Sequence, residues 1–236
     1  MSNTENTSSM KSPFILAAIP CLNEEKFVGD VIRQTLLHVD RVVVIDDGSI
    51  DRTVEIARTC GADVVSHRKC MGAGASTRDG FEYARKIGAD ILITLDGDGQ
   101  HDPSEIPLLL EPIKSDKADL VIGSRFLRTA KIRAYRKFGI NVITFCVNFG
   151  SNYFKFSDSQ CSYRAHNKKA IESIDITDLG FGYSIEVLIQ ANKKRLRITE
   201  VPVSCIYHED GSTINPVEHG ISVLASTIMH RIRLLR

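Results

Sequence analysis

Two carboxylates separated by a single glycine stand directly after an apolar run in the middle of the chain. Residues Ile91 to Leu95 have the character of a buried strand, and the sequence continues through Asp96, Asp98 and Gln100. A carboxylate at the end of a buried strand loses solvation unless a cation or hydrogen bonds compensate it. Carboxylate and amide oxygens suit a hard divalent ion, and such a site keeps positions open for substrate phosphates. Asp98 and Gln100 are therefore predicted to bind Mg²⁺ or Mn²⁺.

Two other interpretations of this segment involve no substrate. The alternating oxygen donors resemble a calcium-binding loop, but that loop requires glycine at its sixth position and a bidentate Glu at its twelfth, where this chain has His101 and Pro107. The segment also fits a polar turn before a helix, because Asp102 or Ser104 can cap a helix with Pro103 in its first turn. The second interpretation is compatible with a metal site and leaves the two carboxylates unexplained.

The surrounding sequence predicts alternating strands and helices. Apolar runs of strand length are bounded by polar or turn-forming residues, and the segments between them have the apolar spacing of amphipathic helices. The predicted strands are 14–19, 41–45, 63–66, 91–95 and 119–123, and the predicted helices between them begin near residues 23, 52, 72 and 103. Such alternation is typical of an α/β fold with a mostly parallel sheet and helices on both faces.

Polar residues also follow two of the other predicted strands, at Pro20 to Glu24 and at Asp46 to Ser49. In open sheets of this kind, ligands bind beyond the carboxyl ends of the strands. We therefore expect these two clusters to meet the segment from Asp96 to Gln100 at one edge of the sheet.

The second half of the chain contains a basic segment, an apolar helix and a polar cluster. Residues 128–137 carry five basic side chains, which form either a solvated helix face or contacts for phosphate. Residues 139–149 predict a helix that is apolar on most sides and is therefore buried, dimerised or pressed against lipid. Residues 158–164 are mostly polar, and residues 183–194 and 197–206 predict a helix and a strand.

The two ends of the chain set the expected domain boundaries. Residues 1–12 are rich in Ser, Thr and Asn and are predicted to be a flexible tail, followed by one domain over residues 13–218. Residues 219–236 predict an amphipathic helix with three arginines near its end. This helix either packs on the domain or lies on an anionic membrane surface.

Composition narrows the class of protein. The chain has 236 residues and a formal net charge of +1, so no global field would attract nucleic acid. Its six cysteines form no CxxC pair, which indicates reduced thiols in a cytoplasmic protein. The N-terminus lacks the apolar segment of a signal peptide, and no apolar run reaches the roughly 18 residues of a membrane span. We expect a protein of the cytoplasm or of the cytoplasmic face of a membrane, in peripheral contact with it.

Several motifs together resemble those of the family 2 glycosyltransferases, and within them the polyprenyl-phosphate sugar synthases of the dolichyl-phosphate mannose synthase type. From residue 14 to about residue 226 they read IPCLNEEK, VVVIDDGSIDRT, MGAGASTRDGFEYA, LDGDGQHDPSEI, DLVIGSRF, AYRKFGIN, DSQCSYRA, GYSIEVLIQA and EVPVSCIYHEDGSTIN. The resemblance implies a GT-A fold, with residues 13–218 as the catalytic domain. It also implies inverting, metal-dependent transfer of a hexose from a nucleotide sugar to a polyprenyl or dolichyl phosphate. Mannose from GDP-mannose is favoured, and glucose or another sugar from a UDP-sugar is the alternative.

The resemblance further implies roles for individual residues, matched motif by motif. The nucleotide-sugar site would comprise Pro20, Asn23, Glu24, Asp46, Asp47 and Asp96. The metal would be bound by Asp98 and Gln100, and the catalytic residues would be Asp98, Arg125 and Arg136, the two arginines meeting phosphate with their planar forks. The acceptor site would comprise Arg133, Asp158 and Gln160.

A phosphate acceptor is favoured on physical grounds. A lipid monophosphate is already anionic and needs chiefly cationic guidance, whereas a hydroxyl acceptor requires a positioned general base. The basic residues between Arg125 and Lys137 fit the phosphate. Two alternatives stay open. One is transfer to a hydroxyl of a glycan, lipid or small molecule, with Asp158 as the base, and the other is a nucleotide-sugar-binding module without catalytic activity.

Overall fold

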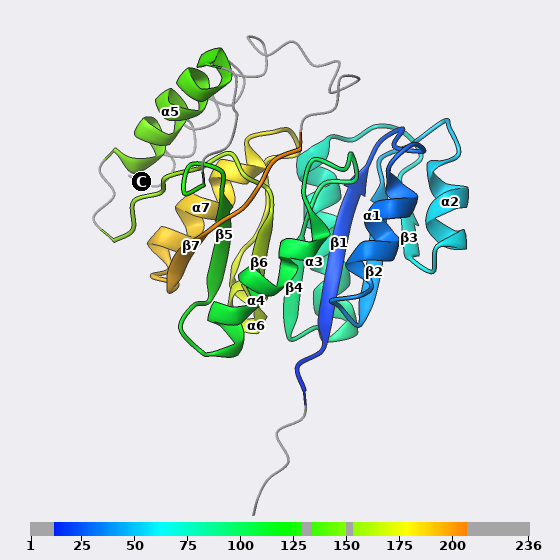
Figure 1. Ribbon diagram of the computed structural model, residues 1–236, viewed down its shortest axis with the longest axis horizontal. Coiled ribbons are helices and arrows are strands. Elements are labelled where there is room, and N and C mark those ends of the chain that lie inside the picture. Colours follow the sequence, from blue (N-terminus) through cyan, green and yellow to red (C-terminus); the bar gives the residue numbers. More distant parts are fainter. Residues whose placement is uncertain (1–11, 129–133, 150–152, 207–236) are drawn as a thin grey trace, which may run out of the picture.

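The computed structural model describes residues 12–128, 134–149 and 153–206, which form a seven-stranded sheet with helices on both faces (Figure 1). The strands are β1 Ile15–Cys21, β2 Arg41–Asp46, β3 Asp63–Ser66, β4 Ile91–Thr94, β5 Leu120–Ser124, β6 Arg164–Asn167 and β7 Ile198–Pro202. The helices are α1 Val28–Thr35, α2 Thr53–Thr59, α3 Ala73–Ile87, α4 Ile106–Lys114, α5 Ala134–Asn148, α6 Lys168–Ser173 and α7 Tyr183–Lys193, with a 3-10 turn η1 at Pro103–Glu105. The predicted tail, apart from residue 12, and the predicted helix at 219–236 lie outside the described residues.

The sheet is mostly parallel, as the sequence predicts. The strand order is β3-β2-β1-β4-β6-β5-β7, and the pairs β1–β2, β1–β4, β2–β3 and β5–β7 are parallel. Strand β6 runs antiparallel to both of its neighbours, β4 and β5. The α/β prediction is thus confirmed, with one reversed strand inside the sheet.

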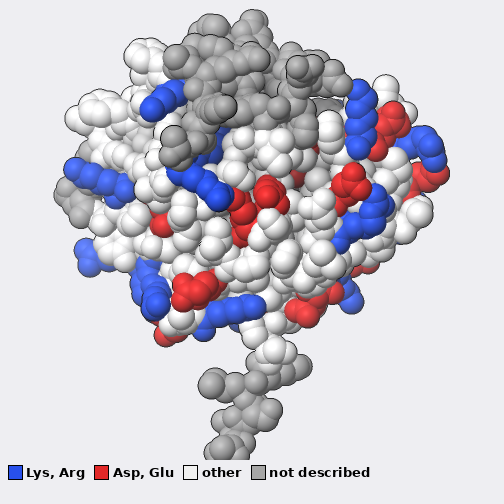
Figure 2. Space-filling model, in the orientation of Figure 1, with Lys and Arg blue, Asp and Glu red and all other residues white. Residues whose placement is uncertain are grey.

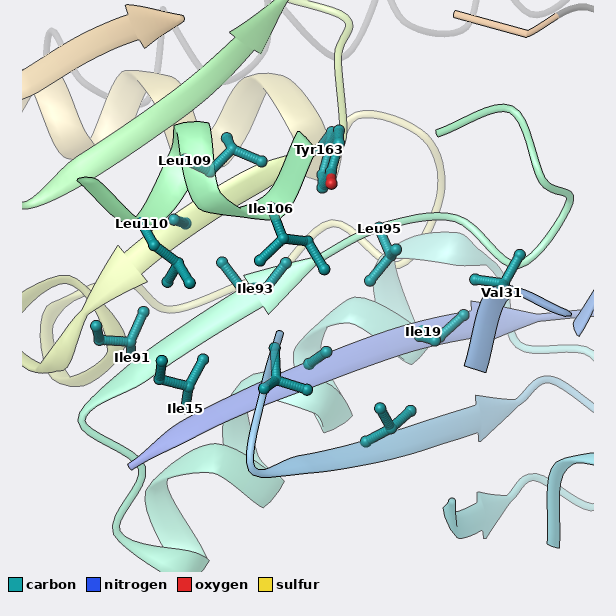
Figure 3. Close-up of a cluster of buried hydrophobic side chains, with 14 of the residues drawn as sticks. Ile15, Ile19, Val31, Ile91, Ile93, Leu95, Ile106, Leu109, Leu110 and Tyr163 are labelled. Atoms are coloured by element: carbon teal, nitrogen blue, oxygen red, sulfur yellow. The ribbon is translucent and has the colours of Figure 1, made fainter. Parts of the chain in front are cut away.

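The central strands bury both of their faces, and this accounts for their nearly continuous apolar sequences. Successive side chains of a strand point to opposite faces, so Ile15 and Ile19 of β1 pack with α1 and α4, while Leu16 packs on the other side with α3 and α7. Figure 3 shows the first of these two layers, where Val31 of α1 and Ile106 of α4 lie over the sheet.

Glycines fix both ends of α3. Gly72 precedes the helix at φ +104°, and Gly88 ends it in the left-handed conformation, where a residue without a Cβ is favoured. Within the first turn, a Cβ on Gly74 would lie 2.0 Å from the carbonyl oxygen of Asp178. The glycine-opened helix predicted at 72–86 is therefore present, and its first turn lies directly against the segment before α7.

Two predicted elements have different bounds in the structure. The helix expected from Asn23 begins only at Val28. Asn23 has a φ of +58°, outside the right-handed helical region, and the backbone N–H groups of Asn23 and Glu24 donate to the hydroxyls of Ser49 and Thr53. The strand expected over 197–206 ends at Pro202. Beyond it the chain turns toward η1, and the backbone N–H of Ser204 donates to the carboxylate of Glu105 at 2.9 Å.

The surface carries both signs of charge. On the face in Figure 2, Lys and Arg side chains alternate with Asp and Glu side chains, and neither sign covers it. Among the described helices, none combines the length and the apolar content that crossing a bilayer requires.

Candidate active site

The loops after β1, β2 and β4 meet at one edge of the sheet, as expected from the parallel order. Strand β1 lies between β2 and β4 in parallel register, with Cys21 opposite Asp46 and Ala18 opposite Thr94. The backbone N–H of Asp47 donates to the carbonyl of Cys21 at 2.8 Å, which extends the pairing beyond the strand ends. All three polar clusters therefore share the edge where ligands of such sheets bind.

Cross-bonds join the loop after β1 to the loop after β2. Asn23, at φ +58°, donates its backbone N–H to the hydroxyl of Ser49 at 2.9 Å and accepts from the N–H of Ile50 at 2.9 Å with its side-chain oxygen. The N–H of Glu24 donates to the hydroxyl of Thr53 at 2.7 Å. Pro20 lies one residue before the end of β1 and is half-buried. These bonds hold two of the predicted nucleotide-site residues, Asn23 and Glu24, in a fixed frame.

Asp46 and Asp47 are both buried, and their carboxylates bond within the protein. Asp46 accepts the N–H of Ser49 at 3.0 Å. Asp47 accepts the N–H groups of Met71 and Gly72, each at 2.8 Å, and Nδ1 of His67 lies 2.7 Å from it. Burial opposes the charged form of Asp47, but the hydrogen bonds from His67 and the loop outweigh it and lower its pKa. Direct contact of Asp47 with the nucleoside stays a prediction.

The loop after β4 is shaped by close packing and short bonds. A Cβ on Gly97 would lie 2.4 Å from Sγ of Cys21, so only glycine fits between the two carboxylates. The hydroxyl of Ser162 donates to Asp96 at 2.7 Å. The N–H of Gln100 donates to Asp98 at 3.0 Å. The predicted metal ligands are thus adjacent on one short turn.

Negative charge accumulates around this turn. Burial, together with the nearby charges of Asp98, Asp96 and Asp51, raises the pKa of Glu24 from 4.5 to about 7. In the part of the chain that the structure describes, no three His, Cys, Asp or Glu side chains form a preassembled metal site. Mg²⁺ sites commonly use one or two carboxylates and complete the shell with water and substrate phosphates. A set of neighbouring carboxylate and amide oxygens fits such an ion.

Arg125 and Asp158 form a buried ion pair, a contact the sequence does not predict. Nε of Arg125 donates to one oxygen of Asp158 at 2.7 Å, and Nη2 donates to the other at 2.8 Å. The Asp158 side chain is fully buried and that of Arg125 is 15% exposed. Burial lowers the pKa of Arg125, but the bonds from Asp158 outweigh it, and the net shift is upward. The structure therefore joins a predicted catalytic residue to a predicted acceptor-site residue.

Of the remaining residues predicted to meet phosphate or the acceptor, the structure describes the side chain of Gln160 but not those of Arg136 and Arg133. The N–H of Gln160 donates to Asp158 at 3.2 Å, and its side-chain Nε2 is buried without a hydrogen-bond partner in the described structure. Arg136 lies in the first turn of α5, where its side chain is not described. Arg133 lies outside the described residues.

Sequence reasoning missed two side chains that organise this site. Ser162 bonds to Asp96 and so links residues 158–164 to the loop after β4, and its place inside the polar cluster at 158–164 was the available signal. His67 lies between Asp47 and Asp79, and nothing around it in the sequence marks it as part of the site.

Helix α5 presents two different faces. Ile143 and Val147 are buried against the core of the sheet. The other face, together with the residue that follows the helix, carries large apolar side chains at helical spacing, all of them at least 37% exposed: Phe138, Val142, Phe145 and Phe149. We refer to these four residues as the α5 stripe. The apolar helix expected from the sequence is thus buried on one side only.

Comparison with known proteins gives consistent matches over most of the chain. The sequence profile of glycosyl transferase family 2 matches residues 17–175. The UDP-N-acetylglucosamine–dolichyl-phosphate N-acetylglucosaminyltransferase of Methanococcus voltae is 31% identical, covering 85% of this chain and 88% of the relative. The undecaprenyl-phosphate mannosyltransferase of Micrococcus luteus is 31% identical, covering 84% of this chain and 86% of the relative.

Solved structures match the fold. Glucosyl-3-phosphoglycerate synthase from Mycobacterium tuberculosis, in complex with Mn²⁺, UDP-glucose and phosphoglyceric acid, has a TM-score of 0.73 to this chain at 20% identity. The match covers 93% of this chain and 80% of that one. At this identity the likeness shows a shared fold.

Proposed function

This chain belongs to glycosyl transferase family 2 and has the GT-A fold, and from this premise we propose that it transfers a hexose from a nucleotide sugar to a polyprenyl phosphate. The observation that carries the proposal is the convergence of three acid-bearing loops at one sheet edge, linked through Ser162 to the segment that holds Asp158. In this proposal, Asn23, Glu24 and Asp46 face the nucleoside, and Asp96 lies by the donor sugar.

We further propose that the reaction uses Mg²⁺ or Mn²⁺. Asp98 and Gln100 would hold the ion, which neutralises the diphosphate of the leaving group. The neighbouring carboxylates of Asp96 and Asp98 support this, because a bound cation would balance their negative charge; after burial, these charges are the next causes of the raised pKa of Glu24. In this proposal the side chains of the loops after β1, β2 and β4 bind and orient the donor, because its phosphates and sugar would lie against these loops.

For the donor, GDP-mannose is favoured, with UDP-glucose or another UDP-sugar as the alternative. The relatives named above include a mannosyltransferase and an N-acetylglucosaminyltransferase, and both names specify a polyprenyl-type phosphate. They therefore support the class of acceptor more strongly than any one sugar.

The geometry of Asp158 also supports a phosphate acceptor. Both of its oxygens accept charged hydrogen bonds from Arg125, so a proton from a hydroxyl acceptor would have to compete with a guanidinium. A lipid phosphate needs no base, because it is already an anionic nucleophile. We propose that Asp158 orients Arg125 and that Arg125 and Arg136 guide the acceptor phosphate.

The α5 stripe suggests how a lipid-linked acceptor is reached. Large apolar patches on the surface of a protein mark protein or membrane contacts. Phe145 is 68% exposed and Phe149 is 71% exposed, and no described residue covers them. We propose that the stripe contacts the membrane that carries the polyprenyl chain, at its cytoplasmic face.

The decisive experiment is transfer from a panel of GDP- and UDP-sugars to a short polyprenyl phosphate, with Mg²⁺ or Mn²⁺ and again with chelator. We expect chelator-sensitive transfer from one donor. Asp98→Ala should abolish turnover and keep the fold, whereas Asp30→Ala, at an exposed ion pair with Arg33, should retain activity. Full activity of Asp98→Ala with metal present would overturn the metal assignment. Nucleotide binding without transfer to any lipid phosphate would overturn the acceptor assignment and favour a hydroxyl acceptor.

A further inference from the structure

His67 lies between two carboxylates at the rim of the nucleotide site. Its Nδ1 is 2.7 Å from an oxygen of Asp47, and its Nε2 is 2.9 Å from an oxygen of Asp79 on α3. The imidazole is 7% exposed, and the backbone N–H of His67 donates to the carbonyl of Asp46 at 2.9 Å. The ring therefore connects the end of β2 to α3 through the residue that follows β3.

Both hydrogen bonds can form together only if the ring is protonated. A neutral imidazole has one N–H and one lone pair, so it can donate to one carboxylate but opposes the other with its lone pair. The imidazolium donates from both nitrogens. Burial lowers the pKa of His67, but the two carboxylates outweigh burial, and the net shift is upward from 6.5.

The clamp formed by Asp47, His67 and Asp79 fixes the backbone of residues 67–72. Asp47 accepts from the N–H groups of Met71 and Gly72, directly before α3. The same stretch packs closely on the turn after β2, because a Cβ on Gly48 would lie 3.0 Å from the backbone of Lys69. The Asp47 carboxylate consequently holds residues 67–72 at both ends, and His67 ties that carboxylate to Asp79 on α3.

We propose that protonated His67 is a positioning residue that sets the affinity for the nucleotide donor by holding Asp47 and residues 67–72 at the rim of the nucleotide site. The inference deepens the proposed function and rests on it, because it assumes that a nucleoside diphosphate binds at this edge. His67 acts through Asp47 and does not itself contact the donor.

The groups around the ring determine the direction of the pH effect. Asp47 and Asp79 face the ring, the thiol of Cys70 bonds to Asp47, and Arg78 bonds to Asp79 and lies 3.8 Å from Glu82. Arg68 and Lys69 of the same loop are exposed. With His67 protonated, the charges of Asp47, His67, Asp79 and Arg78 cancel. Loss of the proton leaves one uncompensated negative charge and breaks one bond, so donor affinity should fall as pH rises through the pKa of His67.

The test measures binding and protonation separately. The Kd values of GDP and UDP with Mg²⁺ are determined by calorimetry from pH 6 to pH 9 for the full chain, His67→Gln and Asp79→Asn. His38→Gln, in the turn between α1 and β2 and so near the opposite edge of the sheet, is the matched control. The protonation of His67 is followed in the same proteins by ¹⁵N chemical shifts of the ring nitrogens.

The inference predicts how the nucleotide Kd and the protonation of His67 change in each variant. Because a hydrogen bond to a charged group is lost, His67→Gln should weaken nucleotide binding about tenfold at pH 6 and should flatten its pH dependence. Asp79→Asn should move the titration of His67 to lower pH, and His38→Gln should behave as the parent. A neutral His67 ring at pH 6, or equal Kd values for the parent and His67→Gln, would overturn the inference while nucleotide binding persists. If parent and control bind neither GDP nor UDP, the proposed function fails together with it.

Discussion

Removing the carboxylate of Asp158 should leave the largely buried guanidinium of Arg125 without its counter-charge. Asp158 accepts two side-chain bonds from Arg125, at 2.7 and 2.8 Å, and two backbone bonds at 3.2 Å from the N–H groups of Arg125 and Gln160. Asp158→Ala deletes all four acceptor contacts and keeps the positive charge. The alanine also leaves a cavity where the carboxylate was.

The expected cost follows from burial. Breaking a buried ion pair on one side typically costs about 3–5 kcal/mol, because an uncompensated charge remains in a medium that solvates it poorly. The Arg125 side chain keeps 15% exposure and can partly reach water, which places the expected value near the lower end, at about 3 kcal/mol. This is a large share of a domain stability of about 5–15 kcal/mol.

The assay is urea unfolding followed by circular dichroism, applied to Asp158→Ala, Arg125→Met and the double variant. If the pair is the source of the effect, the double variant should be destabilised by clearly less than the sum of the two single variants. Asp30→Ala, which breaks an exposed pair with Arg33, should unfold like the parent. Single costs that add within about 0.5 kcal/mol would refute a coupled buried pair.

Three further predictions follow from local geometry. Gly97→Ala should destabilise the fold by about 1–3 kcal/mol in urea unfolding, since its Cβ would meet Sγ of Cys21 at 2.4 Å, and Cys21→Ala in the same chain should restore part of the loss. Burial and the charge of Arg164 lower the pKa of His166 from 6.5 to about 3, so the unfolded state takes up the proton first and the unfolding free energy should decrease as pH falls from 6.5 toward 3. The decrease should be smaller in His166→Leu. Replacing Phe138 and Phe145 by Ser should reduce flotation with liposomes and leave the unfolding free energy unchanged, and undiminished flotation would exclude the α5 stripe as the contact.

Most of the sheet could be predicted because its buried strands consist of continuous apolar residues. The run from Val42 to Ile45 is buried on both faces, and a continuous Val and Ile sequence is what such a strand requires. Strand β6, Arg164–Asn167, could not be predicted in this way. It is polar, and Arg164 is tolerated in the interior because carbonyls of Ser159, Cys161 and Ser184 accept its hydrogen bonds. None of these partners lies in the strand itself, since Ser159 and Cys161 precede it and Ser184 lies on α7.

The candidate site likewise contains residues that could be located from the sequence and contacts that could not. Acids after strands could be located from sequence, because the parallel order brings strand ends to one edge. The pairing of Arg125 with Asp158 and of His67 with two carboxylates depends on side chains that are 33, 20 and 12 residues apart and on how the segments between them pack. Spacing along the chain carries no signal for such contacts.

The reversed direction of β6 has a consequence for how this protein can vary. Strand β5 ends and β6 begins at the same edge of the sheet, since the two are antiparallel neighbours with Ile122 opposite Arg164. The chain between them leaves the sheet and returns to it on one side, with no need to cross back. Its length is therefore not set by the height of the sheet, unlike the lengths of the helical crossovers between the parallel strands. Insertions and exchanges in residues 125–163 can remodel the region around Asp158 while the loops after β1, β2 and β4 keep their framework.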